Sequence, residues 1–109
     1  MKQYLSPDQT AKLIELGFEK PKSIVSVQIS WTQQEHRRNT AYSIGELLSF
    51  LPKEIDCNGF KNILYIFVNQ GAWKVKYFDF LGEVYSTFRS ELIDAIFDMC
   101  VKLKEEGVI

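Results

Sequence analysis

Residues 90–106, SELIDAIFDMCVKLKEE, carry the clearest structural pattern of this chain. Apolar side chains recur every three or four residues, which predicts a helix with one apolar stripe. The stripe consists of Leu92, Ile96, Met99 and Leu103, flanked by Ile93, Phe97 and Cys100. Charged residues fall on the opposite side, and Asp98 and Lys102 are spaced for an ion pair one helical turn apart. The stretch therefore predicts a long amphipathic helix, ended by Gly107, that packs against other elements.

A β-hairpin is predicted immediately before this helix. Residues 63–68 form a continuous apolar and aromatic run, which is typical of a central strand covered on both faces. Asn69-Gln70-Gly71 predicts a tight turn. The return arm alternates Trp73, Val75 and Tyr77 with Lys74 and Lys76, so one of its faces is expected to lie against the core.

Two capped helices and one strand are predicted in the first half of the chain. Ser6, Pro7 and Gln9 form a helix start with a capping box, and Gly17 is placed to end that helix. Ser43 and Glu46 form a second capping box before a short helix that ends at Pro52. Residues 25–32 alternate with period two and predict a strand with one buried face. Residues 33–40 are polar and fit either a loop or the tip of a hairpin with a short return strand.

These elements predict an α+β fold in the order α-β-α-β-β-α, formed by residues 1–109 as a single domain. The expected architecture is a three-stranded, mostly antiparallel sheet with the long C-terminal helix packed on one face. The periodicity leaves the strand order and the covering of the second sheet face open.

Composition limits the function classes. The chain has 109 residues, 46% hydrophobic and 25% charged, so it is too apolar for a disordered protein. Its net charge of −1 lacks the basic excess of nonspecific nucleic-acid binders. An apolar run of the roughly 20 residues that span a membrane is missing. Cys57 and Cys100 lie in unlike contexts and suggest no disulfide. We therefore expect a cytoplasmic protein without a membrane partner.

Three stretches carry a resemblance to other proteins: residues 42–53 (YSIGELLSFLPK), 73–77 (WKVKY) and 92–103 (LIDAIFDMCVKL). On these stretches the chain resembles small proteins of gut bacteria and of their prophages or mobile elements. That family has no assigned activity, so the resemblance implies only a bacterial or phage origin and no functional residues.

Reactive side chains are sparse, which predicts a non-enzymatic protein without a metal or cofactor. His36 has no nearby catalytic or metal-ligating partner and is expected on an exposed loop. Cys100 falls on the apolar side of the last helix, and no cation stands beside Cys57 to activate it. Asp94 and Asp98 are interpreted as part of a solvated helix face. Glycine-rich phosphate loops are missing from the sequence.

One candidate interaction surface combines cations with aromatic rings: Arg37, Arg38, Tyr65, Phe67, Lys74 and Lys76. Its simplest interpretation is that the first two helices cover this sheet face and that the lysines protect an edge strand. Otherwise a protein partner or a second copy covers the face. The sequence thus favours an accessory protein that acts through protein–protein interaction or self-association. The alternatives are a nucleic-acid-binding protein, with these cations in one patch and stacking rings, and a small-ligand binder.

Overall fold

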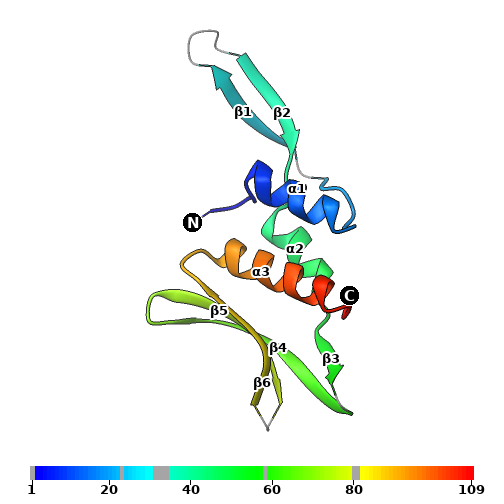
Figure 1. Cartoon of the computed structure of the whole chain (residues 1–109). Coiled ribbons are helices and arrows are strands. Elements are labelled where there is room, and N and C mark those ends of the chain that lie inside the picture. The colour runs from blue at the N-terminus through cyan, green and yellow to red at the C-terminus, as the bar shows by residue number, and fades with distance from the viewer. Residues whose placement is uncertain (1, 23, 31–34, 58, 80–81) are drawn as a thin grey trace.

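Three helices separate a main β-sheet from a smaller hairpin (Figure 1). The computed structural model describes residues 2–22, 24–30, 35–57, 59–79 and 82–109. The elements in chain order are α1 (Pro7–Glu15), β1 (Ile24–Ser30), β2 (Glu35–Thr40), α2 (Ile44–Phe50), β3 (Glu54–Cys57), β4 (Phe60–Asn69), β5 (Ala72–Asp79), β6 (Gly82–Arg89) and α3 (Leu92–Glu105). The predicted α+β class is confirmed.

The predicted three-stranded sheet is wrong, because the main sheet has four antiparallel strands in the order β3-β4-β5-β6. The predicted element order lacks β2, β3 and β6. Strand β2 is polar throughout and β3 has only 4 residues, whereas β6 contains several strand formers. Strand formation depends on cross-strand partners more than on intrinsic preference, so β2 and β3 show little strand signal in the sequence alone.

A separate two-stranded hairpin, β1-β2, extends from the end of the molecule opposite the main sheet (Figure 1). Its backbone register pairs Ile24 with Thr40 and Val27 with Arg37, with an irregularity between Gln28 and Ser30. Residues 35–40 are thus themselves the return strand of a hairpin, whereas the sequence placed residues 33–40 in a loop or in the tip of such a hairpin. Residues 31–34, which include the rest of the predicted strand and connection, lie outside the described residues.

Both predicted capping boxes are confirmed. The Ser6 hydroxyl accepts from the Gln9 backbone N–H at 3.2 Å, and the Gln9 side chain accepts from the Ser6 N–H at 3.0 Å. The Ser43 hydroxyl accepts from the Glu46 N–H at 3.2 Å, and the Glu46 side chain accepts from the Ser43 N–H at 3.3 Å. These bonds satisfy amide groups that have no partner inside the helix, and so fix where α1 and α2 begin.

Gly17 ends α1 as predicted, with a φ of +97° that only glycine adopts easily. The Phe18 N–H donates to the Leu13 carbonyl at 3.1 Å, and the Gly17 N–H donates to the Ile14 carbonyl at 3.0 Å. This pair of bonds is a Schellman ending, which turns the chain away from the helix axis.

Helix α3 lies across one face of the main sheet and forms the centre of the core with it (Figure 1). Ile96, Met99 and Leu103 are fully buried, as are Val75 and Tyr77 on the facing strand. The predicted apolar stripe of α3 is therefore confirmed. The ion pair predicted between Asp98 and Lys102 does not form, because Asp98 pairs instead with Arg89 of β6 at 2.8 Å.

Candidate functional site

The β4-β5 hairpin positions the predicted surface residues. Gln70 and Gly71 at its turn have φ values of +53° and +76°, the positive values that a two-residue type I′ turn requires. The turn fixes a register in which Tyr65 lies opposite Lys76 and Phe67 lies opposite Lys74. The sequence prediction of this hairpin and of its shared face is confirmed.

The two faces of this hairpin have opposite environments, because successive side chains of a strand point to opposite sides. The inner face bears Val75 and Tyr77, which α3 covers. The Tyr77 hydroxyl donates to the Pro52 carbonyl at 2.6 Å, and burial raises its pKa far above the ordinary value. The outer face is here called the open sheet face, and its main residues are Ile63, Tyr65, Phe67, Lys74, Lys76, Phe78, Glu83 and Phe88.

Helices α1 and α2 do not cover the open sheet face, contrary to the sequence interpretation. They lie on the far side of α3 from the main sheet (Figure 1). Ile63 is 50% exposed, Tyr65 47% and Phe88 53%. The prediction that residues 63–68 are covered on both faces is also wrong, because the helices of the described part of the chain pack on the inner side only (Figure 1). Single exposed apolar residues are common on proteins, but a group of them on one sheet face is unusual.

The sequence interpretation that Lys74 and Lys76 protect an edge strand is wrong. They lie on β5, which has β4 on one side and β6 on the other. The edges of the main sheet are β3 and β6. Period-two alternation indicates which residues share a face, but it carries no information about the position of a strand in its sheet.

The aromatic rings of the open sheet face form a cluster around Lys76. Tyr65 and Phe78 pack with ring centroids 4.6 Å apart. The Lys76 ammonium lies 4.4 Å from the Phe78 centroid and 5.1 Å from the Phe67 centroid. Both separations suit cation–π attraction. The lysine stem thus extends over the rings and holds this part of the surface in a defined arrangement.

Glu83 contacts both lysines of β5 and offsets one of their two positive charges. Its carboxylate lies 2.7 Å from the Lys74 ammonium and 3.5 Å from the Lys76 ammonium. The hydrogen bond from Lys74, together with both positive charges, lowers the pKa of Glu83, so it stays ionised. Sequence reasoning missed Glu83 because it missed β6. The run of Val84, Tyr85, Thr87 and Phe88, all strong strand formers, was the signal that could have revealed the strand.

Arg37 and Arg38 do not join Lys74 and Lys76 in one basic patch. Both arginines lie in β2, where their backbones pair with Val27 and Ser26. The β1-β2 hairpin and the main sheet stand at opposite ends of the molecule, with the helices between them (Figure 1). The side chains of Arg37, Arg38 and His36 lie outside the described residues.

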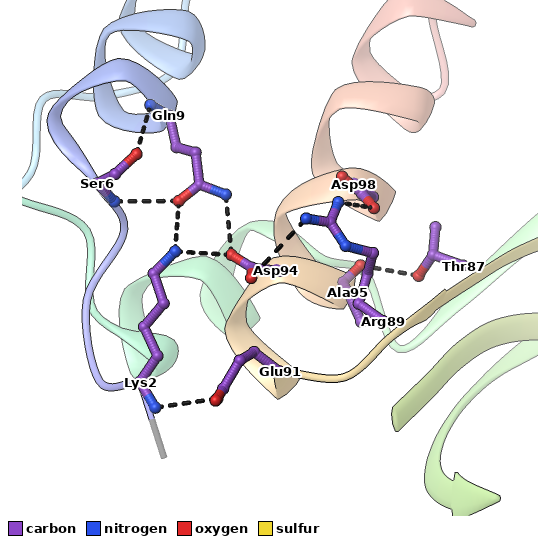
Figure 2. Close-up of polar contacts among 9 residues, drawn as sticks. All are labelled: Lys2, Ser6, Gln9, Thr87, Arg89, Glu91, Asp94, Ala95 and Asp98. Carbon is purple, nitrogen blue, oxygen red and sulfur yellow. Dashed lines mark hydrogen bonds and ion pairs between the residues drawn. The ribbon is translucent and has the colours of Figure 1, made fainter. Parts of the chain in front are cut away.

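A second polar cluster joins α1 to the start of α3 (Figure 2). Asp94 accepts from the Lys2 ammonium and from the Gln9 amide, each at 2.9 Å, and lies 3.9 Å from Arg89. Burial acts to raise the pKa of Asp94, but the hydrogen bonds from Gln9 and Lys2 and the two cations outweigh it, so the pKa is lowered. The interpretation of Asp94 as part of a solvated helix face is therefore wrong. The cluster fastens the N-terminal segment to α3.

The remaining candidate groups show little reactive character. Cys100 is fully buried, its thiol donates to the Leu47 carbonyl at 3.8 Å, and burial raises its pKa to about 12. Such a thiol is not a nucleophile at neutral pH.

An open groove of about 420 Å³ runs between α1 and α3, lined by Lys12, Phe97, Asp98, Val101, Lys102, Glu105 and Glu106.

Among the described residues, no group of three or more His, Cys, Asp or Glu side chains is arranged to hold a metal ion. None of the helices in that part of the chain has the length and apolar character needed to cross a membrane. No protein-family model, no curated protein and no solved structure matches the chain.

Proposed function

We propose that this chain is a non-enzymatic interaction protein that binds another protein surface through the open sheet face. The observation that carries the proposal is the cluster of exposed aromatic and aliphatic side chains on that face, of which Ile63, Tyr65 and Phe88 are each about half exposed. Covering apolar surface yields roughly 25 cal/mol per Å², so such a face favours a partner. Aromatic residues are also the side chains that dominate binding energy at protein interfaces.

The charges of the face support a protein partner over nucleic acid. Lys74 and Lys76 both contact Glu83, so one of the two positive charges beside the rings is offset. Binding to nucleic acid draws most of its affinity from unbalanced cations that displace counterions from phosphates. A carboxylate between the two lysines would repel a phosphate backbone and weaken that binding.

The groove between α1 and α3 gives less support to a small-ligand function. It is open to solvent, and most of the residues that line it are charged, including Lys12, Lys102 and Glu106. Binding sites for small molecules are usually enclosed and mainly apolar, so that most of the ligand surface is buried. The open sheet face is therefore the stronger candidate.

Site-specific photo-crosslinking tests the proposal. A photoreactive amino acid replaces Tyr65 in one variant and Val68 in the other, and each variant is irradiated in an extract of the organism that encodes the chain. Val68 is the matched control because it lies on the same strand, is 55% exposed and points to the opposite side of the sheet. We expect a discrete protein adduct from position 65 and none from position 68. Equal labelling at both positions, or none at 65, would contradict the proposal.

A further inference from the structure

We propose that the partner of the open sheet face is a second copy of this chain, docked face to face about a two-fold axis. The inference rests on the proposed function, because it names the partner for the same surface. Three features of the face support it: a self-complementary arrangement of rings and lysines, balanced charge, and a footprint of suitable size.

The arrangement of side chains on β4 and β5 is self-complementary. Tyr65 and Phe67 form an aromatic column on β4, and their cross-strand partners Lys76 and Lys74 form a cationic column on β5. A two-fold axis parallel to these strands and between them exchanges the two columns. The rings of one copy then cover the lysine stems of the other, and the same contact occurs twice, as a two-fold interface requires. Within the chain, Lys76 already packs against Phe67 and Phe78 in this way.

The charges of the face allow two copies to approach. Lys61, Lys74 and Lys76 share this side of the sheet with Glu54, Asp56 and Glu83, so cations and anions balance. Glu54 lies 3.8 Å from Lys61, and Glu83 contacts the other two lysines. Like charges facing each other across an interface cost several kcal/mol. The proposed axis places Glu54 of one copy opposite Glu83 of the other, because both lie at the same level of the sheet. Each of these carboxylates contacts a lysine of its own chain, which offsets the repulsion. The lysines also enter the interface already paired, so no isolated charge is buried.

The size of the face suits a weak, specific dimer. Strands β5 and β6 have 8 residues each, which corresponds to a length of about 26 Å, and four strands are about 19 Å wide. The flat footprint is therefore on the order of 500 Å². Side chains make this surface uneven, so its solvent-accessible area is larger than the flat footprint. The area that each partner would bury is then about 600 Å², the low end of specific interfaces. We therefore expect a dimer that dissociates on dilution.

Sedimentation equilibrium of the purified full chain tests this inference with wild type, Tyr65→Asp and Val68→Asp. The wild-type mass should rise with concentration from 12.7 kDa towards twice that value. Tyr65→Asp should weaken the dimer at least tenfold, because it places a carboxylate in the apolar centre of the interface. Val68→Asp adds the same charge on the opposite side and should stay within about twofold of wild type. Phe88→Thr, on β6, is the second face variant if Tyr65→Asp does not fold.

Two results would overturn the inference. One is a wild-type chain that stays monomeric at about 1 mM, because a dimer with a Kd above that concentration is too weak to count as specific association. The other is a dimer that neither Tyr65→Asp nor Phe88→Thr weakens, which would place the interface elsewhere, for example at the β6 edge. The photo-crosslinking test separates the two proposals: a monomeric chain that still forms a foreign adduct at position 65 keeps the proposed function and loses the second copy as partner.

Discussion

Glu83 determines what the lysines of the open sheet face are free to bind. Its carboxylate contacts both Lys74 and Lys76, and its pKa is lowered chiefly by the hydrogen bond from Lys74. An aromatic sheet with two unbalanced lysines would resemble the surfaces that stack bases of single-stranded nucleic acid. With Glu83 present, one of the two positive charges is offset, and the carboxylate makes the surface less attractive to phosphates.

Replacing Glu83 with Gln should therefore create a nucleic-acid affinity that the wild type lacks. The substitution leaves the rings unchanged and frees the positive charge of Lys74 and Lys76. We expect the variant to bind a short fluorescent single strand at low salt and to release it as salt rises, because the gain is electrostatic. Fluorescence anisotropy measures it, and tight binding by the wild type itself would contradict the role given to Glu83.

Asp94 should contribute stability that depends on pH. Its pKa in the folded chain lies below the ordinary value of 3.8, so near that pH the unfolded chain binds more protons and stability rises with pH. The contribution is complete above the unfolded pKa and is lost as pH falls through the lower folded pKa. We expect Asp94→Asn to lower stability by about 1 kcal/mol at neutral pH, because a charge-assisted hydrogen bond becomes a neutral one.

Denaturant unfolding at several pH values measures this effect. Asp94→Asn should have a smaller rise in stability between pH 2 and pH 5 than the wild type. Asp56→Asn is the control, because Asp56 is exposed on the short strand β3. A pH profile for Asp94→Asn parallel to that of wild type would show that the polar cluster is not coupled to folding.

At the scale of elements, sequence reasoning succeeded where a local signal and the tertiary structure agree. The capping boxes at Ser6 and Ser43, the type I′ turn at Gln70-Gly71 and the stripe of α3 all depend on nearby residues, so they are readable from the chain. Strands β2, β3 and β6 each pair with a strand next to them in sequence, and all three were missed. Strand β2 is polar throughout and β3 has only 4 residues, so these two carry little strand signal of their own. The candidate site was half predicted. Tyr65, Phe67, Lys74 and Lys76 were correctly placed on one face, whereas Glu83 was missed together with β6. The uncovered face follows only from where the helices pack (Figure 1).

The N-cap of α2 can be tested alone. Ser43→Ala removes the hydroxyl that accepts from the Glu46 N–H, so one amide of the first turn loses its partner. Loss of such a cap costs about 1 kcal/mol of stability. Ser43→Asp, which restores an acceptor, should recover most of that loss in a thermal or urea melt. An unchanged midpoint in Ser43→Ala would show that the cap does not define the start of this helix.

A charged substitution in the buried apolar stripe of α3 should destabilise the fold. Ile96 is fully buried between the sheet and the other helices, so Ile96→Asp places a carboxylate where it has no solvent. We expect a loss of several kcal/mol, which is a large part of a typical total stability of about 5–15 kcal/mol. Circular dichroism melts measure this loss, with Glu105→Asp on the exposed side of the same helix as control. A variant that melts like wild type would mean that this helix face is wrongly assigned.

At the scale of the whole molecule, helical packing is concentrated on one side of the main sheet. Helix α3 fills the inner face, α2 packs on α3, and the Lys2–Gln9–Asp94 cluster fastens α1 to the same helix (Figures 1 and 2). In the described part of the chain, no helix lies over the rings of the outer face (Figure 1). The central claim is therefore that Tyr65 is open to solvent in the isolated chain and is covered only on binding.

NMR with a soluble paramagnetic probe tests that claim most directly, because the probe broadens the signals of atoms it can approach. Tyr65 is 47% exposed and Tyr77 is fully buried, so the two rings serve as test and internal control. In dilute solution we expect strong broadening of the Tyr65 ring and none of the Tyr77 ring, with Tyr65 becoming protected as the concentration rises. A Tyr65 ring already protected in the dilute monomer would contradict the account, because the chain would then cover this face itself.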